Sequence, residues 1–567
     1  MKLNHCLSTL FVVVFGGILA SVAVQPAIAQ IQVNSANPSA APQGTVNLNV
    51  TIAGSGFKKG ATAQWFLTGT TNPGGVTVNS TTFGGSSSLT ANITVAADAV
   101  ISGFDIVVTN LDGRTGKGTD KFAVTAKGTP VGCVTSGTPS GFTLVTTLNQ
   151  VQPNGAASIT SLNLGNAIRV RPLDLNHDGT VDSLAAFVTS GTSSGATRAT
   201  YLFLLDPVTG TIQTQNPVTH ASWQNPILLL TGARATVAAA GDVNGDGVPD
   251  FLMGGADGIA YLFVGSVTPS GSLNPYTPSY AAYQILPPSG APTNWAIAVA
   301  LGDLNGDGAD EIAISATPGK KGTNNAGVFI FGYAGGTLTY LQEFQNPTML
   351  SGGFGDAIAI GNIDGSTGNE LIIGDPGANN SGTVYVFPYP AQQSAFFSLT
   401  GPGPLFGRDL GIGDLNGDGV LDLVVVTGDR FSGSASTAQA LVYLGPVSPG
   451  NAYSNQLLPK TGLAYSFGAP NTDVAGLTAA GAIAIGAPNA STCNSQIGAV
   501  HLYFSPLAAS QQPNYLFQPP SLAGSASFAF GYGVGLAPGY PFLLVGDHIE
   551  DVGSTVQAGQ VYVYKKN

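Results

Sequence analysis

Residues 414–422 read DLNGDGVLD, and this short pattern decides how the rest of the chain is interpreted. Three further stretches share it: DLNHDGTVD at 174–182, DVNGDGVPD at 242–250 and DLNGDGADE at 303–311. A weakened copy, NIDGSTGNE, occupies residues 362–370. The copies begin at 174, 242, 303, 362 and 414, so their spacings are 68, 61, 59 and 52 residues. Recurrence at such intervals indicates a repeated structural unit.

A second series of short apolar runs recurs at similar spacing and continues beyond the last acidic loop. Its seven members lie at 201–203, 261–263, 328–331, 384–387, 441–443, 500–503 and 561–564. Two units, near Thr472–Pro488 and Ala537–Asp547, keep a strand-like run and lack the acidic loop. A unit of about sixty residues has room for four short antiparallel strands but cannot bury both faces of its sheet alone, whereas radial stacking can. We therefore predict a seven-bladed β-propeller over 141–567, with Phe142–Leu148 completing the last blade beside Val561–Tyr564.

The composition supports an all-β fold. Of 567 residues, 43% are hydrophobic and only 8% are charged, with 78 glycines and 36 prolines. General disorder requires fewer apolar residues, and helical bundles require more Glu and Lys on their wet faces, so both are excluded. The chain has 18 Lys and Arg but 30 Asp and Glu, so a basic surface that could bind nucleic acid is excluded as well.

Residues 30–127 are predicted to form a separate immunoglobulin-like sandwich, since several short strand-like runs are separated by turn residues. The runs lie at 46–50, 63–66, 89–95, 104–108 and 122–124. A Gly/Thr/Ser/Pro-rich linker is predicted at 128–140.

The first 29 residues have the pattern of a secretory signal peptide. An apolar run over 10–24 precedes the small residues Ala27-Ile28-Ala29, which are typical of a cleavage site before Gln30. A membrane anchor is the competing interpretation, but the run is shorter than the roughly eighteen residues that a span requires. Export permits a disulfide between Cys133 and Cys493, the two cysteines of the predicted mature chain, and the alternative is two free thiols.

Two family resemblances follow from these motifs. Phe354-Gly355 and Phe406-Gly407 precede acidic loops, and 467–470 reads FGAP, so the second region resembles the FG-GAP repeats of integrin alpha-subunit propellers and of exported bacterial proteins. The resemblance covers about three quarters of the chain and weakens in the first three units, which lack the Phe-Gly pair. The stretches 38–44, 54–57 and 110–113 resemble the IPT/TIG type of immunoglobulin domain, which implies a spacer or interaction module.

The acidic loops predict oxygen cages for a hard cation. Side-chain oxygens at positions 1, 3, 5 and 9 and a backbone carbonyl at position 7 can surround one ion, and glycine at position 6 permits the tight turn. Many oxygen ligands on a flexible loop favour Ca²⁺ over Mg²⁺. The four complete sets are Asp174, Asn176, Asp178, Thr180 and Asp182; Asp242, Asn244, Asp246, Val248 and Asp250; Asp303, Asn305, Asp307, Ala309 and Glu311; and Asp414, Asn416, Asp418, Val420 and Asp422. The degenerate loop offers Asn362, Asp364, Ser366 and Glu370 as a fifth, weaker site.

The alternative for each loop is a metal-free turn, because Asp, Asn and Gly dominate turns in any case. Repetition favours the metal, and 14 of the 30 acidic residues are then ligands that account for much of the low isoelectric point. The G-x-S-x-G match at 191–195 has no strand-to-helix context and is interpreted as chance. His220, His501 and His548 lack metal-ligand spacing and are expected to be solvated or hydrogen-bonded, while Trp295 is expected to be a core aromatic. Trp223 matches no repeat position and is the better candidate for stacking on a ligand.

The function favoured by these observations is that of an exported, calcium-binding adhesion or binding protein without catalytic residues. The resemblance to integrins implies that a protein or carbohydrate ligand docks on the face opposite the metal loops. Two alternatives stay open: an extracellular polysaccharide lyase or hydrolase built on a propeller, and a scaffold component without a small ligand. The enzyme would require acids from several blades to gather in one pocket outside the metal loops.

Overall fold

The computed structural model describes residues 30–567 apart from isolated residues and several segments, of which the longest are 126–137, 150–163, 191–198, 318–325, 348–352, 429–437, 460–466, 521–528 and 549–558. The predicted signal peptide, most of the linker, the G-x-S-x-G match and both cysteines lie outside the described residues. The chain divides into two compact units, residues 1–130 and 131–567. Both are built from β-strands, and the described residues contain one helical turn, the 3-10 helix η1 (Ala378–Asn380).

The first unit consists of two four-stranded sheets. One contains, in spatial order, β1 (Gln32–Asn37), β3 (Leu48–Ser55), β6 (Ser88–Val95) and β5 (Val76–Gly85). The other contains β2 (Ala40–Pro42), β8 (Thr115–Thr125), β7 (Ser102–Thr109) and β4 (Thr62–Leu67). The predicted runs at 63–66, 89–95, 104–108 and 122–124 lie inside β4, β6, β7 and β8, whereas β1, β2 and β5 were not predicted.

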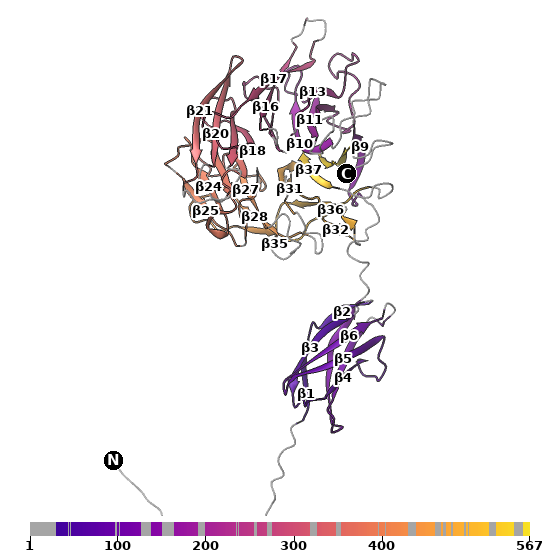
Figure 1. The fold of residues 1–567 in the computed structure, drawn as a ribbon. Coiled ribbons are helices and arrows are strands. Elements are labelled where there is room, and N and C mark those ends of the chain that lie inside the picture. The colour runs from indigo at the N-terminus through magenta and orange to yellow at the C-terminus, as the bar shows by residue number, and fades with distance from the viewer. Residues whose placement is uncertain are drawn as a thin grey trace, which may run out of the picture. The chain divides into compact units, whose positions relative to one another are not determined.

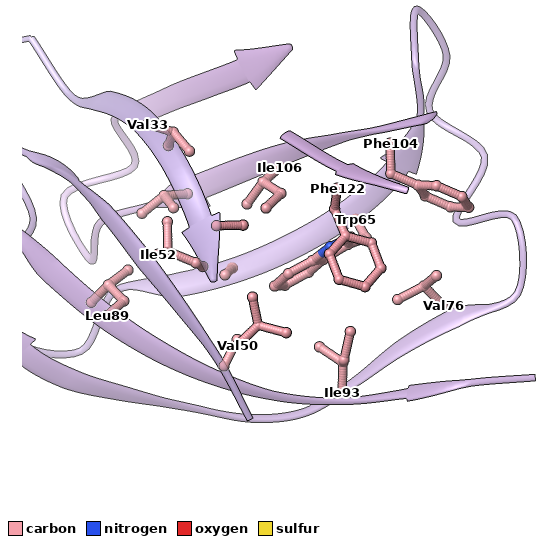
Figure 2. Packing of buried hydrophobic residues seen from close by; sticks show 14 of the residues in the cluster. Val33, Val50, Ile52, Trp65, Val76, Leu89, Ile93, Phe104, Ile106 and Phe122 are labelled. Carbon is pink, nitrogen blue, oxygen red and sulfur yellow. The ribbon is translucent and has the colours of Figure 1, made fainter. Parts of the chain in front are cut away.

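Alternating side chains from both sheets of this unit form a single core. In β6, every second residue is buried, as expected for a strand with one wet face. Figure 2 shows Trp65 beside Phe122 at the centre of the cluster, and their rings meet edge to face with centroids 5.9 Å apart. Because the core is closed within residues 31–124, this unit has the means to fold independently of the second.

The second unit contains, among its described residues, seven sheets of four or five strands and one two-stranded hairpin, and the larger sheets are arranged around a common centre (Figure 1). The first sheet is β10 (Leu164–Leu173), β11 (Ser183–Ser190), β12 (Ala199–Leu205) and β13 (Ile227–Thr231). The second is β14 (Val237–Gly241), β15 (Asp250–Gly254), β16 (Ala260–Val267) and β17 (Pro278–Ile285). The third is β18 (Asn294–Gly302), β19 (Glu311–Thr317), β20 (Gly327–Ala334) and β21 (Thr337–Gln345).

The remaining sheets follow the same order. The fourth is β22 (Ala357–Gly361), β23 (Glu370–Asp375), β24 (Thr383–Phe387) and β25 (Phe397–Leu399). The fifth is β26 (Asp409–Gly413), β27 (Asp422–Thr427), β28 (Gln439–Tyr443) and β29 (Asn455–Leu457), joined at its edge by β35 (Ser510–Gln511). The sixth is β30 (Thr472–Leu477), β31 (Ala480–Ala487), β34 (Ala499–Phe504) and β36 (Tyr515–Phe517), beside the small hairpin of β32 (Ser491–Thr492) and β33 (Ser495–Gln496). The seventh is β37 (Phe530–Leu536), β38 (Phe542–Asp547), β39 (Gln560–Lys566) and β9 (Phe142–Leu148).

The two ends of the second unit meet in the seventh sheet. β9, from the start of the unit, pairs antiparallel with β39, and Thr146 lies opposite Val563. The predicted pairing of Phe142–Leu148 with Val561–Tyr564 is therefore confirmed. The first strands of successive sheets contact one another in chain order, and β37 of the seventh sheet contacts β10 of the first. Each adjacent pair of sheets encloses its own hydrophobic cluster, so the unit has a β-propeller-like fold.

The Phe-Gly pairs have a structural role at the entry to several sheets. Phe406 is fully buried, and Gly407 has φ +86°, a backbone conformation that residues other than glycine rarely adopt. The carbonyl oxygen of Gly407 packs directly on Gly374 of the preceding sheet, leaving no space there for a Cβ atom. Equivalent buried residues followed by positive φ occur at Leu164-Gly165, Trp295-Ala296, Phe354-Gly355, Phe467-Gly468 and Phe530-Gly531. The repeat is therefore more regular in structure than in sequence.

Candidate metal centres

The five acidic loops occupy equivalent places in five successive sheets. Each connects the first strand to the second, running from β10 to β11, β14 to β15, β18 to β19, β22 to β23 and β26 to β27. Because a loop after the first strand always leaves the sheet at the same end, the five loops lie at one end of the unit.

A shared network of hydrogen bonds shapes the loops, and the second loop shows it fully. The carboxylate of Asp242 accepts hydrogen bonds from the backbone N–H groups of Gly245, Asp246 and Gly247 at 2.7–3.2 Å. Asp250, at position 9, reaches back to accept from Val243 N at 2.6 Å. Position 9 accepts from the N–H of position 2 in all five loops, at 2.6–2.9 Å. These bonds fold the carboxylates at positions 1 and 9 over the same turn.

The asparagine at position 3 joins the carboxylates of each complete loop. Its Nδ2 donates to Oδ2 of the position-5 aspartate at 3.0, 3.1, 3.1 and 2.8 Å in the four complete loops. In the third loop, Asn305 Nδ2 also lies 2.6 Å from Glu311 Oε1. In that loop the partly positive amide group thus lies between two carboxylates, and rotating the amide by half a turn would present its oxygen instead. The residues at position 7 (Thr180, Val248, Ala309 and Val420) donate their N–H groups to the position-5 carboxylate at 2.8–2.9 Å.

Burial and mutual repulsion make the position-9 carboxylates reluctant to ionise. Desolvation is the largest cause and raises the pKa of Asp250 and of Glu311 to about 7, with further increases from the carboxylates at positions 1 and 5. The pKa values of Asp182 and Asp422 are raised for the same reasons. The exposed Asp178 differs, because hydrogen bonds from Thr180 and Asn176 lower its pKa.

No basic side chain forms an ion pair with these loops in the part of the chain that the structure describes, although the nearby Arg171 partly opposes the rise that desolvation causes in the pKa of Asp310. The ion pairs there are Lys58–Asp112, Arg114–Asp112 and Lys117–Asp105, all of which belong to the first unit. The loop carboxylates instead bind backbone N–H groups, and no three His, Cys, Asp or Glu side chains within the described ranges converge on one metal position. The oxygen atoms of these loops are of the type that a hard cation prefers. To surround one ion, the asparagine and carboxylate side chains of a loop would have to turn inward.

The degenerate loop contains an unsatisfied oxygen. Glu370 Oε2 accepts from Ile363 N at 2.7 Å and from Asp364 N at 3.1 Å, while the buried Oε1 has no hydrogen-bond partner. Desolvation, together with the nearby Asp364 carboxylate, raises the pKa of Glu370 to about 7. Asn362 and Ser366 are bonded to one another, since Asn362 Nδ2 donates to Ser366 O at 2.5 Å. A buried carboxylate oxygen without a donor is what a cation would satisfy.

Residues at position 8 connect neighbouring loops, a contact that was not predicted from the sequence. Asp310 Oδ2 accepts from Asp242 N at 2.8 Å, and Asp310 N donates to Asp242 O at 2.8 Å. Asn369 Nδ2 donates to Asp303 O at 2.8 Å, and Leu421 N donates to Asn362 O at 2.9 Å. One feature of the sequence could have indicated this contact. The third loop has an acidic residue at position 8, Asp310, although its predicted ligand set is complete without it.

The two tryptophans of this unit are both packed. Trp295 is 1% exposed and donates from its ring nitrogen to Ile285 O at 3.0 Å, so the prediction of a core aromatic is confirmed. Trp223 is half-buried, packs against the cluster between the first two sheets and donates to Gln213 O at 3.0 Å.

The expectation for His501 was wrong, because its imidazole is neither solvated nor hydrogen-bonded through either ring nitrogen within the described residues. It is fully buried on β34, and its ring meets Phe467 edge to face at 5.2 Å. Desolvation lowers the pKa of His501 to about 3 from an ordinary value of 6.5. His548 is half-buried, and desolvation lowers its pKa to about 4.

His501 is expected to make the protein sensitive to acid. Below pH 6.5 the imidazole of His501 is protonated in the unfolded chain, whereas in the folded chain it stays neutral down to about pH 3. The free energy of unfolding therefore falls as the pH decreases through this range. His501→Leu should therefore gain about 2 kcal/mol relative to the wild type between pH 8 and pH 5. Urea denaturation of both proteins at the two pH values measures this gain. An unchanged difference between the two proteins would contradict the assignment.

Comparisons with known proteins agree with this geometry. Residues 295–331, from the start of β18 to β20, match the FG-GAP repeat family. Part of the chain is therefore similar to an FG-GAP repeat, and other parts are similar to integrin alpha subunits. Integrin alpha-8 of Gallus gallus is 29% identical over 195 residues, which are 30% of this chain and 17% of that protein. Integrin alpha-4 of Xenopus laevis is 27% identical over 119 residues, which are 20% of this chain and 11% of that protein.

The FG-GAP match corrects one expectation from the sequence. The third unit, where the resemblance was expected to weaken, matches the family, with Trp295-Ala296 in place of Phe-Gly. The chain spans less than a fifth of the length of these integrin relatives.

Among solved structures, a chain of a humanized mutant of the Chaetomium thermophilum Polycomb Repressive Complex 2 is 8% identical, with a TM-score of 0.41, over 75% of this chain and 97% of that one. The NanB sialidase of Streptococcus pneumoniae is 11% identical, with a TM-score of 0.34, over 82% of this chain and 84% of that one. Both scores are too low to support a functional argument. Within the described residues, no helix has the length and apolar character needed to cross a bilayer.

Proposed function

We propose that this chain is an exported binding or adhesion protein, whose seven-bladed propeller is stabilised by calcium and preceded by an immunoglobulin-like spacer of the IPT/TIG type. The observation that carries the proposal is the repetition of acidic loops, at one end of successive sheets, without a basic partner in the described residues. Uncompensated carboxylates in equivalent positions are costly unless a cation joins them.

Calcium would be held by the loop residues predicted from the sequence. When bound, the ion supplies positive charge to carboxylates that otherwise depend on backbone N–H groups. The likeness to integrin alpha-8 and integrin alpha-4 supports binding or adhesion as the role of the unit. The proposed ligand is a protein or carbohydrate outside the cell.

The number of bound ions tests the metal sites directly. The full chain, dialysed against calcium-containing buffer and analysed by atomic emission, should hold about four Ca²⁺, with a fifth bound more weakly. Asp414→Ala should remove one ion without changing the other sites. A wild-type chain that binds no calcium would overturn the metal assignment.

The adhesion role requires a separate test. Immobilised matrix proteins and polysaccharides, probed with the full chain in calcium and in EDTA, should retain it in calcium only. The same polysaccharides, incubated in solution and assayed for new reducing ends, test the enzymatic alternative. Their release would favour the enzyme, and absence of retention on every surface would contradict adhesion.

A further inference from the structure

A cavity of about 490 Å³ lies where the first strands of the seven sheets converge. Residues of β10, β14, β18, β22, β26, β30 and β37 all line it. Its volume falls in the range of small-molecule sites, and it adjoins the acidic-loop end of the unit, since Asp414 is part of its wall.

Two arginines of β10 project into this cavity. Arg169 and Arg171 are two residues apart on a strand, with the buried Val170 between them, so their side chains leave the same face. The chain has only 18 Lys and Arg in 567 residues, and two of them meet here. Each guanidinium donates from Nη1 to the carbonyl of its preceding residue, at 2.8 Å for Arg169 and 2.9 Å for Arg171.

The carboxylates around the two arginines are engaged by backbone groups. Asp473 Oδ2 accepts from Leu536 N at 2.7 Å, and Asp310 Oδ2 accepts from Asp242 N at 2.8 Å. Asp414 accepts from Gly417 N and Gly419 N, at 2.6 and 3.0 Å. Neither arginine forms an ion pair with a described carboxylate, although Asp473 and Asp310 lie near enough to offset part of the charge on Arg171. Beyond the two backbone carbonyls, no described residue accepts a hydrogen bond from either guanidinium group, so the remaining donors are open to the cavity.

Leaving two like charges together in a confined space is unfavourable, and an anion between them would relieve it. Desolvation lowers the pKa of Arg171, which shows that its surroundings resist the positive charge even with Asp473 and Asp310 nearby. A guanidinium pairs best with a planar group that has two oxygen atoms. The rest of the wall is largely aliphatic, as at Ile358 and Leu410, and suits an apolar body.

We propose that the central cavity binds a small organic carboxylate, with Arg169 and Arg171 donating to its oxygens and the aliphatic walls holding its apolar body. The site adjoins one of the predicted metal cages, because Asp414 belongs to both, and it needs no catalytic step. It also does not depend on the adhesion role.

Isothermal titration of the full chain in calcium with benzoate tests the proposal, and benzamide is the neutral probe of the same shape. Benzoate should bind with one site per chain, and benzamide should bind at least tenfold more weakly. The double variant Arg169→Gln/Arg171→Gln should lose at least tenfold in benzoate affinity. The matched control is Arg114→Gln in the first unit, where the guanidinium pairs with Asp112 at 2.7 Å, and it should bind benzoate as the wild type does.

A thermal scan separates lost binding from lost folding. Removing two neighbouring charges should leave the unfolding midpoint of the free double variant equal to or above that of the wild type. If the double variant does not fold, each single variant carries the test. Wild-type protein that ignores benzoate, or variants that bind it unchanged, would overturn the proposal, and binding of inorganic phosphate without benzoate would show that the carboxylate class is wrong.

Discussion

Transfer of the full chain from 1 mM calcium to excess EDTA is expected to lower its unfolding midpoint by about 10 °C or more. A ligand at a thousand times its Kd stabilises a folded protein by about 4 kcal/mol per site, and four sites would act on the same unit. The physical cause is the collection of loop carboxylates, which lack basic partners in the described residues and repel one another once the ion is removed. Differential scanning fluorimetry in calcium, magnesium and EDTA measures the effect, and magnesium should restore little of it.

A matched pair of variants separates ligation from turn geometry. Asp246→Ala removes a predicted ligand, and about a quarter of the calcium-dependent difference should disappear with it. Asp206 also shapes an exposed turn, because its Oδ1 accepts from Val208 N and Thr209 N at 2.9 and 2.7 Å, but it is not a predicted ligand. Asp206→Ala should keep the full calcium response. Equal midpoints in calcium and EDTA for the wild type would show that the loops are ordinary turns.

The second large effect is expected at the strand that joins the two ends of the second unit. Phe142 of β9 is 5% exposed, and its ring packs edge to face against Tyr515 at 5.1 Å and Phe517 at 5.0 Å. Phe142→Ala should reduce the free energy of unfolding by about 3–5 kcal/mol, because a buried aromatic is lost and a cavity remains. Loosening β9 also exposes the edge of β39, so the whole seventh sheet is affected.

Guanidinium denaturation, followed by tyrosine fluorescence, measures this loss. Phe396→Ala is the control, because Phe396 is 41% exposed and contacts Tyr385 and Phe387 near the fourth sheet. It should cost about 1 kcal/mol or less, as expected for a partly exposed side chain. Similar losses in the two variants would show that β9 does not hold the unit closed.

Much of the second unit could be read from repetition alone. The acidic loops mark where a first strand ends, and the apolar runs mark third strands such as β24 and β28, so the spacing located most sheets. The pairing of β9 with β39 was also predictable, since a strand-like run before the first loop needed a partner. In the first unit, by contrast, β1, β2 and β5 escaped prediction because exposed and irregular strands carry little alternation.

The regularity of the sheet entries was not visible in the sequence. Trp295-Ala296 and Leu164-Gly165 take the place of a Phe-Gly pair, and only the positive φ of their second residue shows it. Alanine gives no sequence signal for such a conformation, which the surrounding packing imposes. The environment of His501 was also not visible in the sequence, because its neighbour Phe467 lies 34 residues earlier and meets it only when the sixth sheet forms.

The sequence by itself determined the repeat, the all-β class and the residues of the acidic loops, because spacing and residue type are local properties. Only the tertiary structure decided which buried atoms lack a hydrogen-bond partner among the described residues, such as Glu370 Oε1 and both ring nitrogens of His501. It alone also placed Arg169 and Arg171 in the wall of the central cavity. The physical reason is that desolvation and charge compensation depend on atoms brought together from all seven sheets. The residue pattern of a single strand does not show which atoms of other strands will surround a group.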